Sequence, residues 1–367
     1  MDSRERTFLS LEHEEPDRVP VDCWFSSAMK TKLEANLNTS YERFLDQNDV
    51  DLRYIEGPRY IGPQLSGYDN TSKIDIWGVP RRQVQIHLKD KTGEYTETYK
   101  EVTFSPLQYA DSVEEILEYD HWPSADWFDY SVIEEQCRKI RDAGRVVVFM
   151  GDRLNRLAQL KPAFYLRGFE QVFVDMKENT EIVRVLFQGI AAFYLEYGRR
   201  ILEAAKGKID ILCTGDDFGA QDGPFLSLSM WINFLKKGFE EYIKLGKAHG
   251  AYVMHHTCGS VYSLIPEMIN CNLDILQSLQ PEVTGMNPKI LKDEFGDRLS
   301  FQGGVSIQKV LPHGSPADVR EHVKMLLEIM APQGGYIACT SHNIQADTPL
   351  CNLEALFETY RKFGWYR

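Results

Sequence analysis

The sequence predicts an α/β fold, a closed (β/α)8 barrel of the TIM type. Two observations support this prediction. Short apolar runs rich in β-branched residues alternate with longer helical segments, and these runs are eight in number. Eight strand–helix units are the number that closes such a barrel. A doubly wound open sheet is the competing interpretation, because it shows the same alternation.

The predicted strands are short, and most are separated by helix-like stretches. They cover residues 18–24, 52–57, 145–151, 209–217, 251–259, 273–280, 299–306 and 335–341. Residues 180–205 and 315–332 have a clear helical pattern, and Ser315 before Pro316 is typical of a capped helix start.

The segment from residue 58 to about 144 interrupts the alternation. Within it, residues 74–107 are predicted to form β-strands joined by a turn at "KDKTGE" (89–94). We interpret the segment as an excursion after the second strand, a β-meander that covers part of the barrel mouth. Because the excursion lies inside the barrel, residues 1–367 are predicted to form a single domain.

Charge and composition restrict the partners of the chain. A net charge of −13 argues against nucleic acids and membrane surfaces, which are also anionic. Seven scattered cysteines indicate reduced thiols, and the N-terminus lacks the apolar region of a secretory signal. The absence of G-x-G-x-x-G and Walker sequences argues against a nucleotide cofactor. We therefore expect a cytoplasmic protein that acts on a small molecule or a protein partner.

One predicted strand ends in "HHTCG" (255–259), at the edge where barrel enzymes have their active sites. Side chains alternate along a strand, so His256 and Cys258 face one way and His255 faces the other. About 0.17 such H-x-C pairs are expected by chance, so the pair alone is weak evidence for a metal site. A buried thiol beside a hydrogen-bonded histidine is the alternative.

Cys339 in "GYIACTSHN" strengthens the metal interpretation, because it also lies near the end of a predicted strand. With His256 and Cys258 it makes three donors suited to a catalytic zinc site with an open fourth position. The two cysteines are 339 − 258 = 81 residues apart, so only the fold can bring them together.

Other polar residues follow predicted strands. Asp216 and Asp217 are candidates to orient a zinc ligand, supply a fourth ligand or accept a proton, and the alternative is that one of them caps the next helix. His342 is a candidate contact for a cofactor or a substrate, or else it fixes the loop backbone. Gln221 is predicted to contact substrate or to hold a loop.

Three residues in and just after the second predicted strand are candidates for substrate binding: Tyr54, Arg59 and Tyr60. Arg59 is suited to binding a carboxylate, but it is equally suited to pairing with an acidic group on the surface.

Four stretches together carry a specific resemblance. The chain resembles the uroporphyrinogen decarboxylase superfamily and, within it, the cobamide (corrinoid)-dependent methyltransferase branch. The stretches are "SRERTFLSLEHEEPDRVPVD" (3–22), "TGDDFGAQDGPFLS" (214–227), "FGDRLSFQGGVSIQKVLPHGSPADVREHV" (295–323) and "GGYIACTSHNIQADTPLCNLEALFE" (334–358).

The resemblance implies zinc held by the motif H-x-C…C, which maps onto His256, Cys258 and Cys339. It also implies a methylcorrinoid carried on a separate partner protein, and a methyl donor or acceptor that is a thiol, tetrahydrofolate or a methoxy-aromatic compound, the last by O-demethylation. Zinc lowers the pKa of a bound thiol, or it polarises a methyl ether oxygen. The chain lacks a corrinoid-binding stretch such as D-x-H-x-x-G, which fits a corrinoid that arrives on its partner.

Two other functions remain open at this point. A metal-independent decarboxylase of a bulky carboxylic acid needs basic side chains at the barrel mouth, and the sequence offers few besides Arg59 and Arg153. The arginine-rich "RQAGR" type of loop found in porphyrinogen decarboxylases does not follow "VPVDCW". The third possibility is a barrel without catalytic activity that only binds a ligand or a partner.

Overall fold

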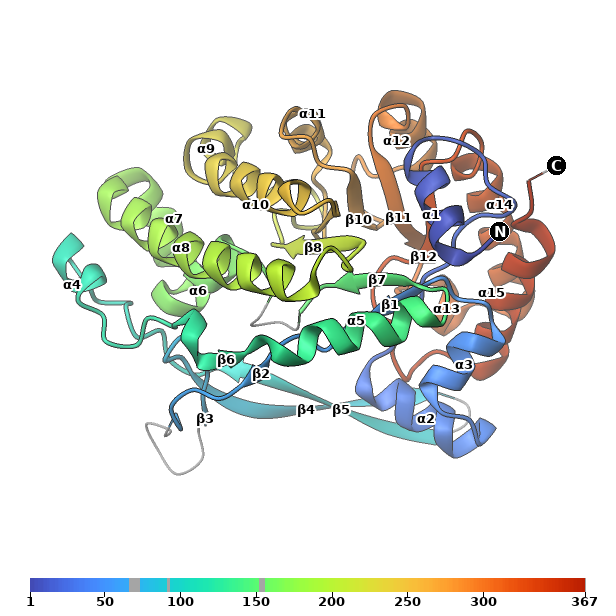
Figure 1. Cartoon of the computed structure of the whole chain (residues 1–367), viewed down its shortest axis with the longest axis horizontal. Helices are drawn as coiled ribbons and strands as arrows, with labels where there is room; N and C mark the ends of the chain where they lie inside the picture. Colours follow the sequence, from blue (N-terminus) through green and yellow to red (C-terminus); the bar gives the residue numbers. More distant parts are fainter. Residues whose placement is uncertain (66–72, 91–92, 152–155, 367) are drawn as a thin grey trace.

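The structure is a computed structural model that describes residues 1–65, 73–90, 93–151 and 156–366. Its centre is a sheet of seven parallel strands in the order β1-β7-β8-β9-β10-β11-β12 (Figure 1). Nearly all residues of these strands are buried, as expected for parallel strands covered on both faces. The strands are β1 (Leu52–Tyr54), β7 (Val146–Phe149), β8 (Ile211–Gly215), β9 (Tyr252–His256), β10 (Ile275–Leu279), β11 (Ser300–Val305) and β12 (Tyr336–Thr340).

The prediction of a strand at residues 18–24 is wrong. No strand forms there: Val21 makes an isolated parallel bridge with Ala338 of β12, and Arg18 makes an isolated antiparallel bridge with Trp365. The carbonyl of Val21 also accepts a hydrogen bond of 2.8 Å from the backbone N–H of Asp51, next to β1. Pro20 has no N–H to donate, which limits the ladder that this segment can form. The sheet is therefore curled, and one short segment bridges its two outer strands.

A buried carboxylate holds this bridging segment in place. Asp51 is fully buried, and its side chain accepts a hydrogen bond from the backbone N–H of Val21 at 2.8 Å. It also forms ion pairs with Arg6 at 2.7 Å and Arg18 at 2.8 Å. Two cations and one backbone donor thus compensate one buried charge.

Helices cover the outside of the sheet (Figure 1). The longest, α8 (Thr180–Ala205), confirms the helix predicted at residues 180–205. Helix α14 (Pro316–Met330) begins after Ser315, which forms a capping box with Asp318. In the described ranges, no helix has both the length and the apolar character needed to cross a membrane. The other α-helices are α1 (Ser3–Leu11), α2 (Ser27–Leu37), α3 (Tyr41–Gln47), α4 (Val113–Leu117), α5 (Ile133–Asp142), α6 (Leu160–Arg167), α7 (Phe169–Glu178), α9 (Leu228–Phe234), α10 (Lys236–Ala248), α11 (Ile265–Asn270), α12 (Pro288–Phe295), α13 (Val310–His313) and α15 (Leu350–Phe363).

Two small antiparallel sheets lie in the segment between β1 and β7. Strands β4 (Pro80–Asp90) and β5 (Gly93–Val102) form a long hairpin, and β3 (Lys73–Ile74) pairs with β4. Strands β2 (Arg59–Tyr60) and β6 (Phe128–Asp129) form the second sheet. Figure 1 shows the hairpin running along one side of the molecule. The predicted turn at residues 89–94 falls partly on residues 91–92, outside the described residues. Short 3-10 helices are η1 (Ala125–Trp127), η2 (Tyr130–Val132) and η3 (Tyr262–Leu264).

The ion-pair network predicts a large stability effect at one residue. Replacing Asp51 by Ala (Asp51→Ala) leaves Arg6 and Arg18 without their buried partner, and we expect the free energy of unfolding to fall by about 3–5 kcal/mol. Urea denaturation followed by circular dichroism measures the change. The matched control is Asp46→Ala, which removes a carboxylate that is 67% exposed and pairs with Arg53; it should cost less than about 1 kcal/mol. Equal losses in the two variants would contradict the role of Asp51.

Candidate metal centre

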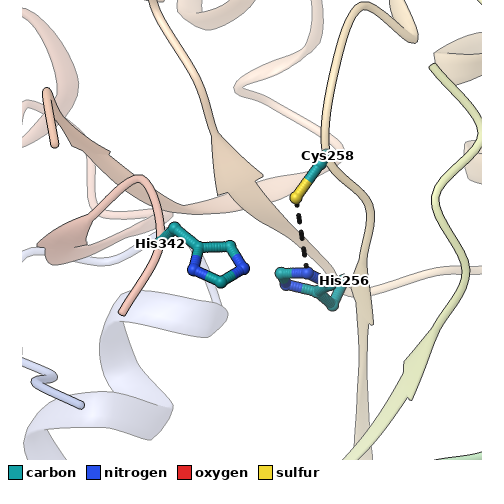
Figure 2. A group of neighbouring side chains, drawn as sticks. All are labelled: His256, Cys258 and His342. Atoms are coloured by element: carbon teal, nitrogen blue, oxygen red, sulfur yellow. Dashed lines mark hydrogen bonds between the residues drawn. The ribbon is translucent and has the colours of Figure 1, made fainter. Parts of the chain in front are cut away.

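Three side chains with metal-binding atoms meet at the carboxyl ends of the strands. His256 is the last residue of β9, Cys258 follows two positions later, and His342 comes shortly after β12. One ligand atom from each lies within 4.8 Å of the others (Figure 2). Cys258 Sγ is 3.6 Å from His256 Nε2. Zinc bonds of about 2.0–2.3 Å place tetrahedral ligand atoms roughly 3.3–3.8 Å apart, so this pair fits one ion.

His255 lies on the other side of β9, as the strand alternation predicts. Its ring stacks on Phe218 at a centroid distance of 5.0 Å and meets the edge of Phe239 at 4.8 Å. Its Nδ1 is 2.8 Å from Thr214 Oγ1. Burial lowers the pKa of His255 to about 3, so the ring is neutral and packs as part of the hydrophobic core.

A chain of hydrogen bonds connects His256 to a buried carboxylate on the bridging segment. His256 Nδ1 is 2.9 Å from Gln277 Oε1, and Gln277 Nε2 donates to Gln302 Oε1 at 2.9 Å. Gln302 Nε2 donates in turn to Asp22 Oδ2, which also accepts the hydroxyl of Tyr54 at 2.6 Å. The chain therefore runs across β9, β10 and β11 to the segment beside β12.

The direction of the hydrogen bonds in this series determines which ring nitrogen of His256 carries no proton. Burial raises the pKa of Asp22 to about 6, so the carboxylate is still mainly ionised at neutral pH and can only accept. Each amide in the chain must then donate towards Asp22 and accept from the other side. His256 Nδ1 carries the proton at the end of the chain, which leaves the lone pair of Nε2 available for a metal ion.

Asp217 lies next to the three ligand residues. Its Oδ1 accepts the backbone N–H of Cys258 at 3.1 Å and is 4.0 Å from His256 Nε2. Its Oδ2 is 2.6 Å from the ammonium of Lys161. Burial alone would raise the pKa of Asp217, but the charge of Lys161 holds that pKa well below its usual range. Asp217 is therefore ionised and is a poor proton acceptor.

Asp216 has a different position from its neighbour. Its two oxygens accept the backbone N–H groups of Gln159, Leu160 and Lys161 at 2.6–3.0 Å, at the start of α6. Burial raises its pKa to about 6, although these hydrogen bonds oppose the shift. Asp216 therefore caps a helix, but this helix is α6, which precedes it in the chain, and not the next helix as the alternative predicted; α9 is capped by Ser227. Asp217 lies beside the candidate ligand residues.

Burial keeps the three candidate ligand residues uncharged. It lowers the pKa of His256 well below the usual value, and the positive charge of Arg156 lowers it further. It also lowers the pKa of His342. For Cys258, burial and then the charge of Asp217 raise the pKa to about 12. A protonated thiol beside neutral imidazoles is a set of groups that releases a proton on binding a metal ion.

Cys339, the third predicted ligand, is buried on β12. Its Sγ is 3.9 Å from Asp22 Oδ2 and 4.0 Å from Thr340 Oγ1. Among the described residues, the group of ligand atoms within 4.8 Å contains His342 and not Cys339. The ligand role of Cys339 stays a prediction.

The four predicted substrate-binding residues are spread over the structure. Tyr54 lies on β1 and donates to Asp22, as described above. Arg59 is 69% exposed and pairs with Asp129 at 2.7 Å, which matches the surface-pair alternative. The hydroxyl of Tyr60 donates to the carbonyl of Pro63, also on the surface. Gln221 lines a cavity of about 410 Å³ together with Cys258 and His342.

A larger cavity, of about 600 Å³, is lined by both His256 and His342, and its size is typical of small-molecule sites. Residues of the β4–β5 hairpin contribute to its wall. The lining residues are Trp24, Ile86, Tyr99, Glu101, Met150, Gly151, Arg156, Lys161, Gly215, Asp217, His256, His342 and Gln345.

Sequence reasoning missed several of these functional residues. Gln277 and Gln302 each interrupt an apolar strand, and a buried amide needs hydrogen-bond partners, so their sequence positions were a usable signal. Arg156 and Lys161 follow the third predicted strand, but the sequence alone does not show which cations of that loop reach the site.

Comparisons with known proteins agree with this architecture. Residues 158–363, more than half of the chain, match the family described as uroporphyrinogen decarboxylase (URO-D). A methyltransferase from Methanosarcina mazei has a similar structure, with a TM-score of 0.68 and 17% sequence identity over 99% of each chain. Because the identity is low, that likeness shows a common fold. No curated protein is detectably similar in sequence.

Two other solved structures are much less similar, and no conclusion depends on them. A D-psicose 3-epimerase has a TM-score of 0.38 and 9% identity, with 68% of this chain and 84% of that chain covered. The 3-keto-D-glucoside 4-epimerase YcjR from E. coli has a TM-score of 0.38 and 12% identity, with 72% and 96% covered.

The hydrogen-bond chain predicts that Gln277 controls metal affinity without binding the metal. In Gln277→Leu the acceptor for His256 Nδ1 is lost, so we expect zinc affinity to fall about 10–100-fold. Competition with a chromogenic chelator measures the affinity. The matched control is Gln83→Leu at an exposed position of β4, which should leave the affinity unchanged. An unchanged affinity in Gln277→Leu would show that the tautomer of His256 does not depend on this chain.

Proposed function

The chain belongs to the uroporphyrinogen decarboxylase family, and we propose that it is a zinc-dependent methyltransferase. In this proposal it moves a methyl group between a methylcorrinoid carried on a partner protein and a small molecule. The small molecule is a thiol, tetrahydrofolate or a methoxy-aromatic compound. Family membership supports an enzyme, and the shared fold with a methyltransferase supports this class of reaction.

One observation carries the proposal. His256, Cys258 and His342 bring soft and borderline donor atoms within 4.8 Å of one another, beside a cavity of about 600 Å³. A decarboxylation without metal has no need of such a donor set.

We propose that His256 and Cys258 are the fixed pair of zinc ligands and that the end of β12 supplies the third. Two residues there are candidates. Cys339 is the ligand that the family resemblance implies, and His342 is the donor that lies nearest in the described structure. They are three positions apart in the chain, and in the described structure the thiol of Cys339 lies 3.9 Å from Asp22 Oδ2.

When bound, zinc supplies Lewis acidity that activates a thiol or a methyl ether oxygen. The residues of the chain prepare the site for this chemistry. Gln277 keeps His256 Nε2 free of its proton. Asp217 fixes the backbone of Cys258 and stays ionised through its pair with Lys161. Trp24, which packs on His342 at a centroid distance of 5.0 Å, forms an apolar wall that limits the access of water.

The alternative, a decarboxylase of a bulky acid, needs several uncompensated cations. Of the described residues that line the cavity, only Arg156 and Lys161 carry a positive charge, and Lys161 is paired with Asp217. Arg59 is paired on the surface, and Arg153 lies outside the described residues. The charge of the cavity therefore favours a substrate with few acidic groups.

We also propose that residues 1–367 act as one catalytic domain with a complete (β/α)8 barrel, in which the bridging segment takes the place of a strand. The β4–β5 hairpin would form part of the surface where the corrinoid protein docks. The supporting observation is that Ile86, Tyr99 and Glu101 of the hairpin line the same cavity as His256.

Metal analysis of variants tests the ligand set. The purified protein should bind about one zinc per chain, and Cys258→Ser or His256→Ala should abolish this binding, because each removes a ligand of the fixed pair. Cys339→Ser and His342→Ala identify the third ligand, since only the variant that lacks it should lose zinc. The controls are Cys351→Ser and His313→Ala, at exposed positions of α15 and α13. A protein that binds no zinc on titration would refute the metal-dependent mechanism.

A methyl-transfer assay tests the reaction itself. The zinc-loaded protein is mixed with methylated or reduced cobalamin and a panel of thiols, folates and methyl ethers, and the cobalamin spectrum is followed in both directions. We expect transfer with at least one partner and a loss of at least about 100-fold in Cys258→Ser, because the Lewis acid is then absent. No transfer with any pair would refute the proposed function.

A further inference from the structure

Among the described residues, the larger cavity contains one cation, Arg156, for which no counter-ion is found. Arg156 lines this cavity together with His256 and His342. In the described part of the chain, its Nε is buried and has no hydrogen-bond partner. A buried donor without a partner is costly, so Arg156 is suited to an acceptor beyond the described residues, such as a bound anion.

The backbone around Arg156 is built to hold it at this place. The next residue, Leu157, bridges Thr214 of β8, and its carbonyl accepts the N–H of Gly215 at 2.8 Å. A Cβ at Gly215 would lie 2.3 Å from Cδ of Arg156. Gly215 is outside the left-handed region, so its backbone conformation does not require glycine. The missing side chain at Gly215 therefore leaves the space through which Arg156 crosses the end of β8.

The charges of the cavity indicate how many negative charges a ligand would carry. Lys161 is 2.6 Å from Asp217 Oδ2, and this pair is close to neutral. The other carboxylate of the lining, Glu101, is exposed and its charge is screened by water. Within the described lining, Arg156 keeps one positive charge without a close counter-charge, which matches a monoanion better than a phosphate monoester of charge about −2.

The remaining wall of the cavity is apolar and aromatic, with Trp24, Ile86, Tyr99 and Met150. We infer that Arg156 is an anion-binding subsite and that the small-molecule substrate has an apolar body with a single carboxylate or sulfonate group that Arg156 binds. A guanidinium binds either group with two parallel hydrogen bonds. Binding of the anionic group by Arg156 does not depend on the proposed function. Only the orientation of the substrate, with its other end facing His256 and Cys258, rests on the proposed function.

Equilibrium binding to the full-length protein, without any corrinoid, tests this inference. Calorimetry compares three probes of nearly the same shape: 3-methoxybenzoate, 3-methoxybenzenesulfonate and the neutral 3-methoxybenzamide. We expect at least one anion to bind about tenfold or more tightly than the amide, as a charge-assisted hydrogen bond provides. The comparison of the two anions distinguishes a carboxylate site from a sulfonate site.

Variants assign the preference to one side chain. In Arg156→Gln, the affinities for the anions and for the amide should agree within about twofold. Arg156→Lys should keep part of the preference for anions, because it keeps the positive charge. Gly215→Ala should weaken the preference for anions although Arg156 is unchanged, because the added Cβ would displace the Arg156 side chain. Arg320→Gln, which removes an exposed guanidinium that pairs with Glu358, is the control and should behave as the wild type does.

Three outcomes would overturn the inference: no preference for anions in the wild type, no binding of either anion at millimolar concentration, or a preference that persists in Arg156→Gln. The result is independent of the methyl-transfer assay. A clear anion preference without methyl transfer would support the anion-binding subsite and refute the proposed function. Methyl transfer without an anion preference would support the proposed function and refute the subsite.

Discussion

The buried carboxylate of Asp22 connects the curvature of the sheet to the candidate metal centre. Asp22 lies on the segment that bridges the outer strands β12 and β1, and its backbone N–H donates to the carbonyl of Ala338 on β12. Its side chain accepts from Tyr54 of β1 and from Gln302 of β11. Through Gln277, the same chain of hydrogen bonds reaches His256. A change in how the bridging segment packs would therefore alter the orientation of His256.

Burial decides the chemistry of the groups at this centre. With little access to water, His256 and His342 are neutral and the thiol of Cys258 keeps its proton. Of the charged groups at this centre, one has an ion-pair partner and one has none among the described residues. Asp217 has Lys161, whereas Arg156 has no such partner among the described residues. The site thus combines neutral donors suited to a metal ion with one cation suited to an anion.

The sequence prediction of the fold was right where the physical pattern is local. Apolar β-branched runs identified all seven strands of the parallel sheet, and the helices at 180–205 and 315–332 were found from their periodicity and capping. The prediction failed at residues 18–24, because "VPV" has the composition of a strand but Pro20 cannot donate to a ladder. For the site, the alternation of side chains placed His256 and Cys258 on one face and His255 on the other, as the contacts of His255 confirm.

Sequence alone thus established the strand–helix order, the H-x-C pair at a strand end and the family resemblance, because each depends on residues that are neighbours in the chain. The sequence did not determine which distant side chains lie next to the H-x-C pair. The approach of His342 to His256, the contact of Cys339 with Asp22, the capping role of Asp216 and the position of Arg156 in the cavity all depend on how separate strands are arranged around the sheet. Those contacts span dozens of residues, and only the packed structure brings their atoms within bonding distance.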